Sequence, residues 1–482
     1  MTQEFVQLLN DVAAQHIDIC IDSRQAAAGM IFVAVPGAAA DGAHFIPMAV
    51  QQGARIIVCR PQAAEGLAAQ ATGCRVLWHE DPREALWQLA AARYNTAQHA
   101  PKVLAVTGTN GKTTTAYLLE HVLQALGHST GVLGTVSYRW PGHSEQAPLT
   151  TPDALRVHRM LYEMAEAGVE YAIMEASSHA LDQQRVDGVP FAGAIFTNLT
   201  QDHLDFHHDM ESYFAAKSRL FLDLANKNTA MAINADDAWG RKLLAQCPQA
   251  YAYGLEPNNL PNKQVRGTIL SMNTEGMRLA MTCGQRSWEL ASPLVGAFNA
   301  ANLMGVQSLL LALGFDTQAF APLHTFHGVS GRLERVVNKA GLDVFVDYAH
   351  TPDALIKAQN ALRGAGFSRI ITLFGCGGDR DRTKRPLMAA AVAEYSDLAV
   401  LTSDNPRTED PMSIIADALP GLSKAKEQIV EADRRTATAK ALQCMHKGDA
   451  LLIAGKGHED YQIIGTVKHH YSDQETVREL LA

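Results

Sequence analysis

The chain has 482 residues, of which 47% are hydrophobic and 19% are charged, a composition typical of a globular protein. A single hydrophobic core stops growing at roughly 250–300 residues, so we expect two or three domains. The formal net charge of −9 excludes a broad basic surface for nucleic acid, so any binding of a polyanion must be local.

The seven cysteines are scattered without a Cys-x-x-Cys pair, which argues against a disulfide framework and against a zinc knot. The N-terminal sequence lacks the basic start and the apolar run of a secretion signal. No apolar stretch approaches the roughly 20 residues that span a bilayer. We therefore expect a soluble cytoplasmic protein without membrane insertion.

Short β-branched segments alternate with Ala- and Leu-rich helical segments, which predicts an α/β protein with mainly parallel sheets covered by helices. The predicted strands are 31–35, 55–58, 103–106, 171–174, 194–196, 230–233, 344–346, 370–373, 398–401 and 450–453. A helical segment before Pro101 and the loop 328–332 suggest two linkers. They divide the chain into predicted domains 1–99, 100–331 and 332–482.

A glycine-rich loop connects the strand at 103–106 to a predicted helix that begins at Lys112. Its residues are Gly108, Thr109, Asn110, Gly111, Lys112, Thr113 and Thr114. Such a loop presents backbone N–H groups to phosphates, while Lys112 adds positive charge and the Thr113 hydroxyl can bind Mg²⁺. The usual spacing would need glycine at Val106, so this loop is a shortened variant. The alternative is a structural turn followed by a surface lysine, but the flanking strand and helix favour ATP.

Acidic and histidine residues follow the next strands. Glu175 ends the strand at 171–174 and is a candidate second Mg²⁺ ligand, although capping of the following helix fits it equally well. The segment 201–209, which contains His203, is rich in Asp and His and favours Mg²⁺ over zinc because it lacks the HExxH spacing. Lys217 lies on a predicted helix with apolar neighbours, and these residues alone favour a lysine that snorkels to solvent.

Four polar clusters follow four predicted strands of the last domain, at 347–352, 375–381, 404–407 and 455–459. The carboxyl ends of parallel strands meet at one sheet edge, where open α/β sheets bind ligands. Arg380 and Arg407 can bind carboxylates bidentately, and Glu459 can receive an ammonium group. The sequence therefore predicts a zwitterionic ligand at this edge.

Together and in this order, these motifs resemble the Mur ligases of bacterial peptidoglycan synthesis over essentially the whole chain. The resemblance is carried by residues 22–24, the loop 108–113, and residues 175–179, 197–205, 299–302, 331–332 and 347–350, with the C-terminal clusters. It implies a smaller N-terminal α/β domain for a UDP-sugar substrate, a central P-loop-type ATPase domain with a mainly parallel sheet, and a C-terminal Rossmann-like α/β domain for the incoming amino acid.

The resemblance also assigns the ATP and metal site. Lys112, Glu175, His203 and Lys217 would be the catalytic residues, and Thr113, Glu175 and His203 would hold Mg²⁺ together with Lys217 as a carbamate. A carbamate turns the lysine into an anionic oxygen ligand. The residues implied to contact ATP are those of the loop 108–114 with Asn299, Asn302, Arg332, Asp347 and His350.

The resemblance implies two further substrates. The UDP-N-acetylmuramoyl-L-alanyl-D-glutamate contacts would be Ile21, Ser23, Thr150, Thr151, Ser177, Gln183 and Arg185. At Ala38-Ala39-Ala40 the family pattern is more polar, and these alanines offer no polar side chain to uridine. The meso-diaminopimelate contacts would be Arg380, Asp404, Asn405, Pro406, Arg407, Gly455 and Glu459. Arg407 is typical of diaminopimelate-adding members, because its guanidinium matches the second carboxylate of that amino acid.

The implied reaction is phosphorylation of the D-glutamate γ-carboxylate by ATP, followed by attack of the diaminopimelate amine on the acyl phosphate. One alternative is a lysine-adding Mur ligase. A second is a ligase like folylpolyglutamate synthetase, which should lack the UDP-binding domain and the cluster at 404–407. A nucleotide-dependent switch is a third, but a switch needs no zwitterion pocket. We expect a monomer without a nucleic-acid partner.

Overall fold

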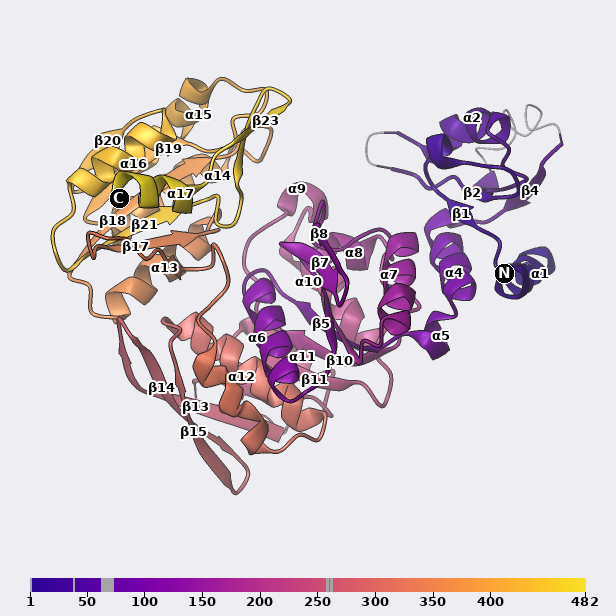
Figure 1. The fold of residues 1–482 in the computed structure, drawn as a ribbon, viewed down its shortest axis with the longest axis horizontal. Coiled ribbons are helices and arrows are strands. Elements are labelled where there is room, and N and C mark those ends of the chain that lie inside the picture. The colour runs from indigo at the N-terminus through magenta and orange to yellow at the C-terminus, as the bar shows by residue number, and fades with distance from the viewer. Residues whose placement is uncertain (1, 38–39, 62–72, 257–259, 261–262) are drawn as a thin grey trace. The chain divides into compact units, whose positions relative to one another are not determined.

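The computed structural model describes residues 2–37, 40–61, 73–256, 260 and 263–482 (Figure 1). It divides into two compact units, of which the first comprises Met1–Gly108, Leu123–Ile195 and Glu211–Met231. The second comprises Thr109–Val122, Phe196–Met210 and Ala232–Ala482. The domain boundaries 1–99, 100–331 and 332–482 stay predictions. Ala38 and Ala39, two of the three alanines at which the family pattern is more polar, lie outside the described residues.

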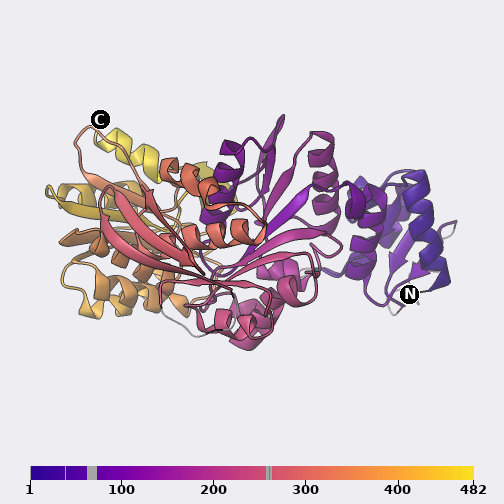
Figure 2. The same ribbon diagram turned by 90° about the horizontal axis from the view of Figure 1, so that it is seen from below.

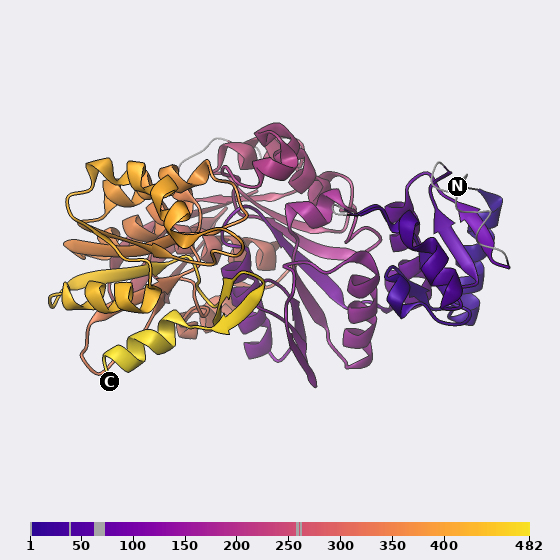
Figure 3. The same ribbon diagram turned by 90° about the horizontal axis from the view of Figure 1, so that it is seen from above.

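The N-terminal part of the first unit is a small parallel sheet between helices, visible in indigo in Figure 3. The strands β1 (Ile19–Cys20), β2 (Ile31–Val33), β3 (Ile56–Cys59) and β4 (Arg75–Trp78) pair in that order. The helices α1 (Gln3–Gln15) and α4 (Pro82–Tyr94) bury Phe5, Leu8 and Leu89 against one face, and α2 (Ile46–Gln51) covers the other. The short 3₁₀ helices η1 (Ser23–Gln25) and η2 (Gly42–Phe45) complete this part.

The same unit contains a second sheet segment in the order β10-β5-β9-β6-β7-β8. Its strands are β10 (Phe191–Phe196), β5 (Lys102–Thr107), β9 (Tyr171–Glu175), β6 (Thr130–Leu133), β7 (Ser137–Trp140) and β8 (His143–Gln146). The strands β5, β9 and β6 are parallel, and β7 and β8 form an antiparallel extension. The accompanying helices are α5 (Thr96–His99), α7 (Ala154–Glu166), α8 (Ser178–Asp182) and α10 (Met210–Leu222).

The second unit begins with the glycine loop, α6 (Lys112–Ala125) and α9 (Leu204–His207). The strands β11 (Ala230–Asn234), β12 (Tyr251–Gly254) and β13 (Lys263–Asn273) are parallel, whereas β14 (Gly276–Cys283) and β15 (Arg286–Ser292) continue as an antiparallel ribbon, drawn as long salmon arrows in Figure 2. The helices of this region are α11 (Ala238–Leu244), α12 (Ala297–Ala312) and η4 (Thr317–Thr325). The strands β13, β14 and β15 were not predicted from the sequence, and β13 and β15 expose many of their residues and contain no apolar run.

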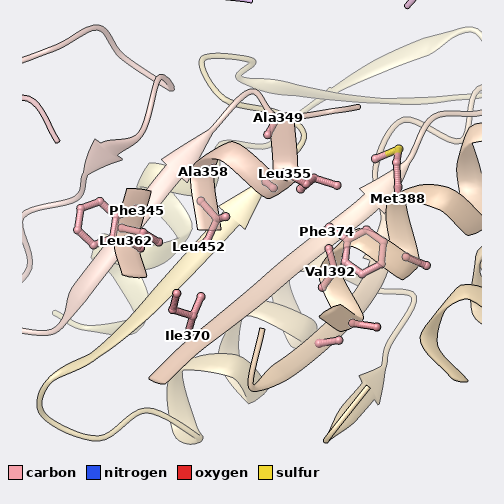
Figure 4. Close-up of a cluster of buried hydrophobic side chains, with 14 of the residues drawn as sticks. Phe345, Ala349, Leu355, Ala358, Leu362, Ile370, Phe374, Met388, Val392 and Leu452 are labelled. Atoms are coloured by element: carbon pink, nitrogen blue, oxygen red, sulfur yellow. The ribbon is translucent and has the colours of Figure 1, made fainter. Parts of the chain in front are cut away.

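The C-terminal part of this unit is a six-stranded sheet in the order β16-β17-β21-β18-β19-β20. Its strands are β16 (Glu334–Arg335), β17 (Asp343–Asp347), β21 (Asp449–Ala454), β18 (Arg369–Cys376), β19 (Leu398–Ser403) and β20 (Gln428–Val430), all parallel except β16. The helices α13 (Pro352–Gly364), α14 (Lys384–Tyr395) and α15 (Pro411–Ala418) cover one face, with η5 (Leu419–Lys424) beside α14. Phe345, Leu362, Phe374 and Val392 form the core beneath them (Figure 4).

The other face carries α16 (Arg434–Gln443) and α17 (Asp473–Leu480), and the hairpin of β22 (Tyr461–Ile464) and β23 (Val467–His470) follows β21. The prediction of an α/β fold with mainly parallel sheets is confirmed, and each predicted strand is present with ends shifted by a few residues. No helix among the described residues is long and apolar enough to cross a membrane.

Candidate functional site

The four C-terminal clusters follow β17, β18, β19 and β21, which are neighbours in the sheet. The clusters therefore share one edge, as predicted. The strands are not consecutive in the chain, however, because β20 lies between β19 and β21 in sequence but takes an outer position in the sheet.

The glycine loop is held in shape by Asn198. Thr109 N donates to Asn198 O at 2.8 Å, and Asn110 N donates to Asn198 Oδ1 at 3.0 Å. Asn198 Nδ2 donates in turn to Asn110 O at 3.1 Å. At Gly111 φ is +87°, and a Cβ there would lie 2.5 Å from Asn302 Oδ1, so a side chain does not fit. The loop backbone is thus set for close approach of a phosphate.

Cationic and hydroxyl groups gather at the start of α6. Lys112 Nζ donates to Thr109 O at 2.8 Å, and Arg332 Nη2 donates to Thr113 Oγ1 at 3.0 Å. Asn302 Nδ2 donates to Asn299 Oδ1 at 3.2 Å. The structure therefore brings together several residues of the predicted ATP site, and this set of donors fits a polyphosphate.

A buried carboxylate lies next to His203, which itself has a positive φ of 53°. Asp202 Oδ1 accepts from Lys384 Nζ at 2.6 Å, and Asp202 Oδ2 lies 3.4 Å from His203 Nε2. Burial alone would raise the pKa of Asp202, but the charges of His203, His350 and Lys384 lower it well below its usual range. Lys384 was not predicted from the sequence, because it lies 182 positions from its partner.

In the first unit, Glu175 is fully buried and both of its carboxylate oxygens are occupied. Oε1 accepts from Thr135 N and Oε2 accepts from Thr135 Oγ1, each at 2.9 Å. A Cβ at Gly134 would lie 2.4 Å from Oε1, so this close approach requires glycine. The interpretation of Glu175 as a helix cap is wrong, because the Ser177 side chain caps α8 by accepting from Ala180 N. The backbone N–H and the side-chain hydroxyl of Thr135 thus hold the Glu175 carboxylate in place.

The residues predicted to bind the dipeptide part of the UDP substrate form one hydrogen-bonded cluster. Thr151 Oγ1 donates to Glu175 O at 2.7 Å and lies 3.2 Å from Ser177 Oγ. Arg185 Nη1 donates to Thr151 O at 3.0 Å, and its Nη2 donates to Gln183 Oε1 at 2.7 Å. Thr150 Oγ1 lies 3.2 Å from Thr135 Oγ1. Ile21 and Ser23 take no part in these hydrogen bonds, and Ser23 Oγ donates to Met48 Sδ at 3.2 Å.

Lys217 lies on α10 with only 1% of its surface exposed. Nζ donates to Gly108 O at 2.9 Å and lies 4.8 Å from the centre of the Tyr213 ring. The interpretation of Lys217 as a snorkelling surface lysine is therefore wrong. Its amine lies beside Gly108, the residue at which the glycine loop begins.

At the C-terminal edge, Arg380 and Arg407 flank Gly377, because a Cβ at that glycine would lie 3.1 Å from Arg407 Nη1 and 3.6 Å from Arg380 Cγ. Arg407 Nη1 donates to Gly378 O at 2.7 Å, whereas Arg380 is exposed. Asn405 Nδ2 donates to Glu459 Oε2 at 2.9 Å. Two positively charged groups and one carboxylate therefore lie at the same edge.

The remaining residues of this edge are Gly455, Glu459, Asp347 and His350, and each has close polar neighbours. A Cβ at Gly455, where φ is +113°, would lie 2.4 Å from Asp404 Oδ2. Burial and the charge of Asp404 raise the pKa of Glu459, although Asn405, Lys456 and Arg407 oppose the shift. Asp347 accepts from Leu333 N at 2.6 Å and from Ala349 N at 2.7 Å, and His350 Nδ1 lies 2.8 Å from Tyr348 O.

Besides Lys384, three residues of the site were missed by sequence reasoning: Thr135, Asp353 and Lys456. Thr135 binds Glu175, and Asp353 Oδ2 accepts from Asn110 Nδ2 at 3.0 Å and from Thr200 Oγ1 at 3.1 Å. Lys456 lies inside the cluster 455–459, but nothing in the sequence of that cluster indicates that it is buried. Among the described residues, no three His, Cys, Asp or Glu side chains are grouped to hold a metal ion, and the Mg²⁺ site stays a prediction.

The fold and the loop define an α/β protein of the phosphate-binding-loop class. Sequence models of three Mur ligase domains match the chain: the family's catalytic domain at residues 18–94, the middle domain at 106–310 and the glutamate ligase domain at 331–457. The chain belongs to the Mur ligase family.

Individual relatives cover nearly the whole chain. A UDP-N-acetylmuramoyl-L-alanyl-D-glutamate–2,6-diaminopimelate ligase of Lawsonia intracellularis is 52% identical over 476 residues, which are 98% of each chain. One of the same name from Gloeobacter violaceus is 47% identical, covering 96% of this chain and 93% of its own. A solved structure of a ligase with that name is 32% identical with a TM-score of 0.67, covering 96% of this chain and 94% of its own. The MurF structure from Acinetobacter baumannii, at 22% identity and a TM-score of 0.65 over 93% of this chain and 95% of its own, shares the fold.

Proposed function

We propose that this chain is an ATP-dependent ligase that joins meso-diaminopimelate to the D-glutamate γ-carboxylate of UDP-N-acetylmuramoyl-L-alanyl-D-glutamate. The observation that carries the proposal is the C-terminal sheet edge, where Arg407 and Arg380 flank Gly377 and Glu459 is held by Asn405. Guanidinium groups and a carboxylate at one edge suit a zwitterion with a second carboxylate. The names of relatives at 52% and 47% identity support this substrate.

The reaction would proceed in two steps. A γ-carboxylate oxygen attacks the ATP γ-phosphorus, which forms an acyl phosphate and releases ADP. The diaminopimelate amine then attacks the acyl carbon, loses a proton and expels phosphate from the tetrahedral intermediate. Phosphorylation is needed because a carboxylate is a poor electrophile without a leaving group. Catalysis of both steps consists mainly of positioning and charge stabilisation.

We assign the roles to this chain's residues as follows. The loop 108–114 binds the ATP phosphates, and Lys112 and Arg332 offset their charge. Thr113, Glu175, His203 and Lys217 as a carbamate would hold Mg²⁺, which would neutralise charge on the transferring phosphoryl oxygens. The remaining ATP contacts are Asn299, Asn302, Asp347 and His350. The cluster of Thr150, Thr151, Ser177, Gln183 and Arg185 holds the muramoyl dipeptide, and Ile21 and Ser23 contact its uridine end.

We further propose the domains 1–99 for the UDP-substrate, 100–331 for ATP and 332–482 for the amino acid. A monomer acting in the cytoplasm is consistent with seven free cysteines, since reducing compartments keep thiols unpaired. It is also consistent with substrates that are soluble nucleotides and amino acids.

The deciding experiment measures phosphate release from ATP with UDP-N-acetylmuramoyl-L-alanyl-D-glutamate present. Addition of meso-diaminopimelate should stimulate release strongly, and mass spectrometry should find the tripeptide product. L-Lysine at the same concentration is the matched control, because it lacks the second carboxylate of diaminopimelate. It should stimulate phosphate release far less. Stimulation by L-lysine alone would identify a lysine-adding ligase, and release indifferent to both amino acids would refute ligase activity.

A further inference from the structure

Lys456 has a fully buried side chain, directly after Gly455 at the end of β21. Its Nζ donates to Asn405 Oδ1 at 3.0 Å and to Tyr461 O at 2.8 Å. Two carboxylates lie slightly farther away, with Asp404 Oδ1 at 3.6 Å and Glu459 Oε2 at 3.9 Å. A buried ammonium is costly to the fold unless its hydrogens are bonded and its charge is paired. The surroundings of Lys456 meet both conditions.

The ammonium of Lys456 fixes the orientation of the Asn405 amide. Asn405 Oδ1 accepts from Lys456 Nζ and also from Ile463 N at 2.9 Å. Rotating the amide by half a turn would set its NH₂ group against both donors. The Nδ2 end must therefore face Glu459, to which it donates at 2.9 Å. Lys456 in this way determines, through Asn405, where the Glu459 carboxylate lies.

The same ammonium ties the β22–β23 hairpin to the loop 404–407. Besides the bond to Tyr461 O, Gln462 Nε2 donates to Asp404 O at 2.7 Å. The backbone of Arg407 is held on both sides, since its N donates to Ile463 O at 3.1 Å and its O accepts from Gly465 N at 2.7 Å. Arg407 has a φ of +52°, a conformation that costs energy for a residue with a side chain. The hairpin supplies the contacts that maintain it.

We propose that Lys456 is a positioning residue of the amino-acid site, acting through Asn405 and the β22–β23 hairpin on Glu459 and Arg407. It does not itself contact the ligand. Glu459 and Arg407 are thereby preset for the ammonium and carboxylate groups of an incoming zwitterionic amino acid. Because both side chains are already fixed, less conformational entropy is lost when the amino acid binds. The inference rests on the proposed function in taking an amino acid as the ligand of this edge.

The test compares Lys456→Met and Gln462→Ala with the parent chain by phosphate release. Lys456→Met should raise the KM for meso-diaminopimelate at least about 10-fold, equivalent to about 1.4 kcal/mol, while the KM for ATP stays within about 2-fold. Gln462→Ala, which leaves the buried ammonium in place, should produce a smaller rise of the same kind. Lys440→Met is the matched control, because Lys440 is half exposed and pairs with Glu431, which is not one of the residues assigned to the amino-acid site. It should leave both KM values unchanged.

Equal changes in the two KM values, or no change in either, would overturn the proposal. If Lys456→Met does not fold, Gln462→Ala decides by the same comparison. A parent chain that is active with neither meso-diaminopimelate nor L-lysine contradicts the proposed function instead. The crystal structure of Gln462→Ala or Lys456→Met then decides the positioning role: Glu459 and Arg407 must leave their parent positions, and an unchanged site refutes it.

Discussion

Lys217 Nζ donates a hydrogen bond to the carbonyl oxygen of Gly108 at 2.9 Å, so a buried amine on α10 lies directly beside the phosphate loop. An ammonium group repels Mg²⁺ and a neutral amine is a poor ligand for it, whereas a carbamate shares one negative charge between two oxygens, the ligand atoms that Mg²⁺ prefers. The contact with Gly108 supports the proposed modification, and it gives the buried amine a partner on an otherwise apolar helix face.

Lys217→Ala should lower the rate of phosphate release by about 100- to 1,000-fold, because an anionic group next to the transferring phosphoryl is lost. Lys227→Ala is the control, since Lys227 is an exposed lysine of the same unit. Formate or acetate should restore part of the Lys217→Ala activity by replacing the carbamate. Absence of rescue together with an active Lys217→Arg would show that the side chain acts as a cation.

Arg407→Ala should raise the KM for meso-diaminopimelate by about 10- to 100-fold, because a charge-assisted hydrogen bond contributes about 1.5–3 kcal/mol. The KM for ATP should change little. Steady-state kinetics with each substrate varied in turn measures both constants. Arg435→Ala serves as control, since Arg435 is an exposed arginine paired with Glu479. A similar increase in both KM values for Arg407→Ala would refute the assigned contact.

Thr135→Val should lower kcat by about 10-fold or more, because it removes the hydroxyl that donates to the buried Glu175 Oε2 and leaves that oxygen without this bond. Thr135→Ser keeps the hydroxyl and should retain most of the activity. Phosphate release at saturating substrates measures the effect. Equal activity of the two variants would show that the hydroxyl has no role in orienting Glu175.

Glu409 provides a pH test of the loop that carries Arg380. Its hydrogen bonds with Arg385, and a further one from Asp379 N, lower its pKa from 4.5 to about 2. A lowered folded-state pKa stabilises the fold above the unfolded value and loses that contribution as the pH falls from about 4.5 to about 2. Glu409→Gln should therefore have a lower Tm than the parent at pH 6. The difference should shrink steadily between pH 4.5 and pH 3, and a constant difference over this range would contradict the assignment.

The chemistry of the site could be predicted where it depends on residues close together in the chain. The loop 108–114 is a strand, a glycine turn and a helix start, and Arg407 and Glu459 follow apolar strands whose carboxyl ends meet at a sheet edge. The roles of Thr135, Asp353 and Lys384 could not be predicted in this way. Each binds a partner between 40 and 243 positions away in the sequence. A local sequence pattern contains no information about contacts at such separations.

The sequence by itself determined the α/β class, the positions of the ten predicted strands and the residue types at their ends, because these follow from periodicity and turn chemistry over a few residues. Only the tertiary structure decided that β13, β14 and β15 form a partly exposed ribbon and that β20 takes an outer position in its sheet. It also decided that Lys217 and Lys456 are buried. Burial depends on what packs against a side chain from elsewhere in the chain, so the same lysine in the same helix or turn can be either a surface group or an organiser of the site.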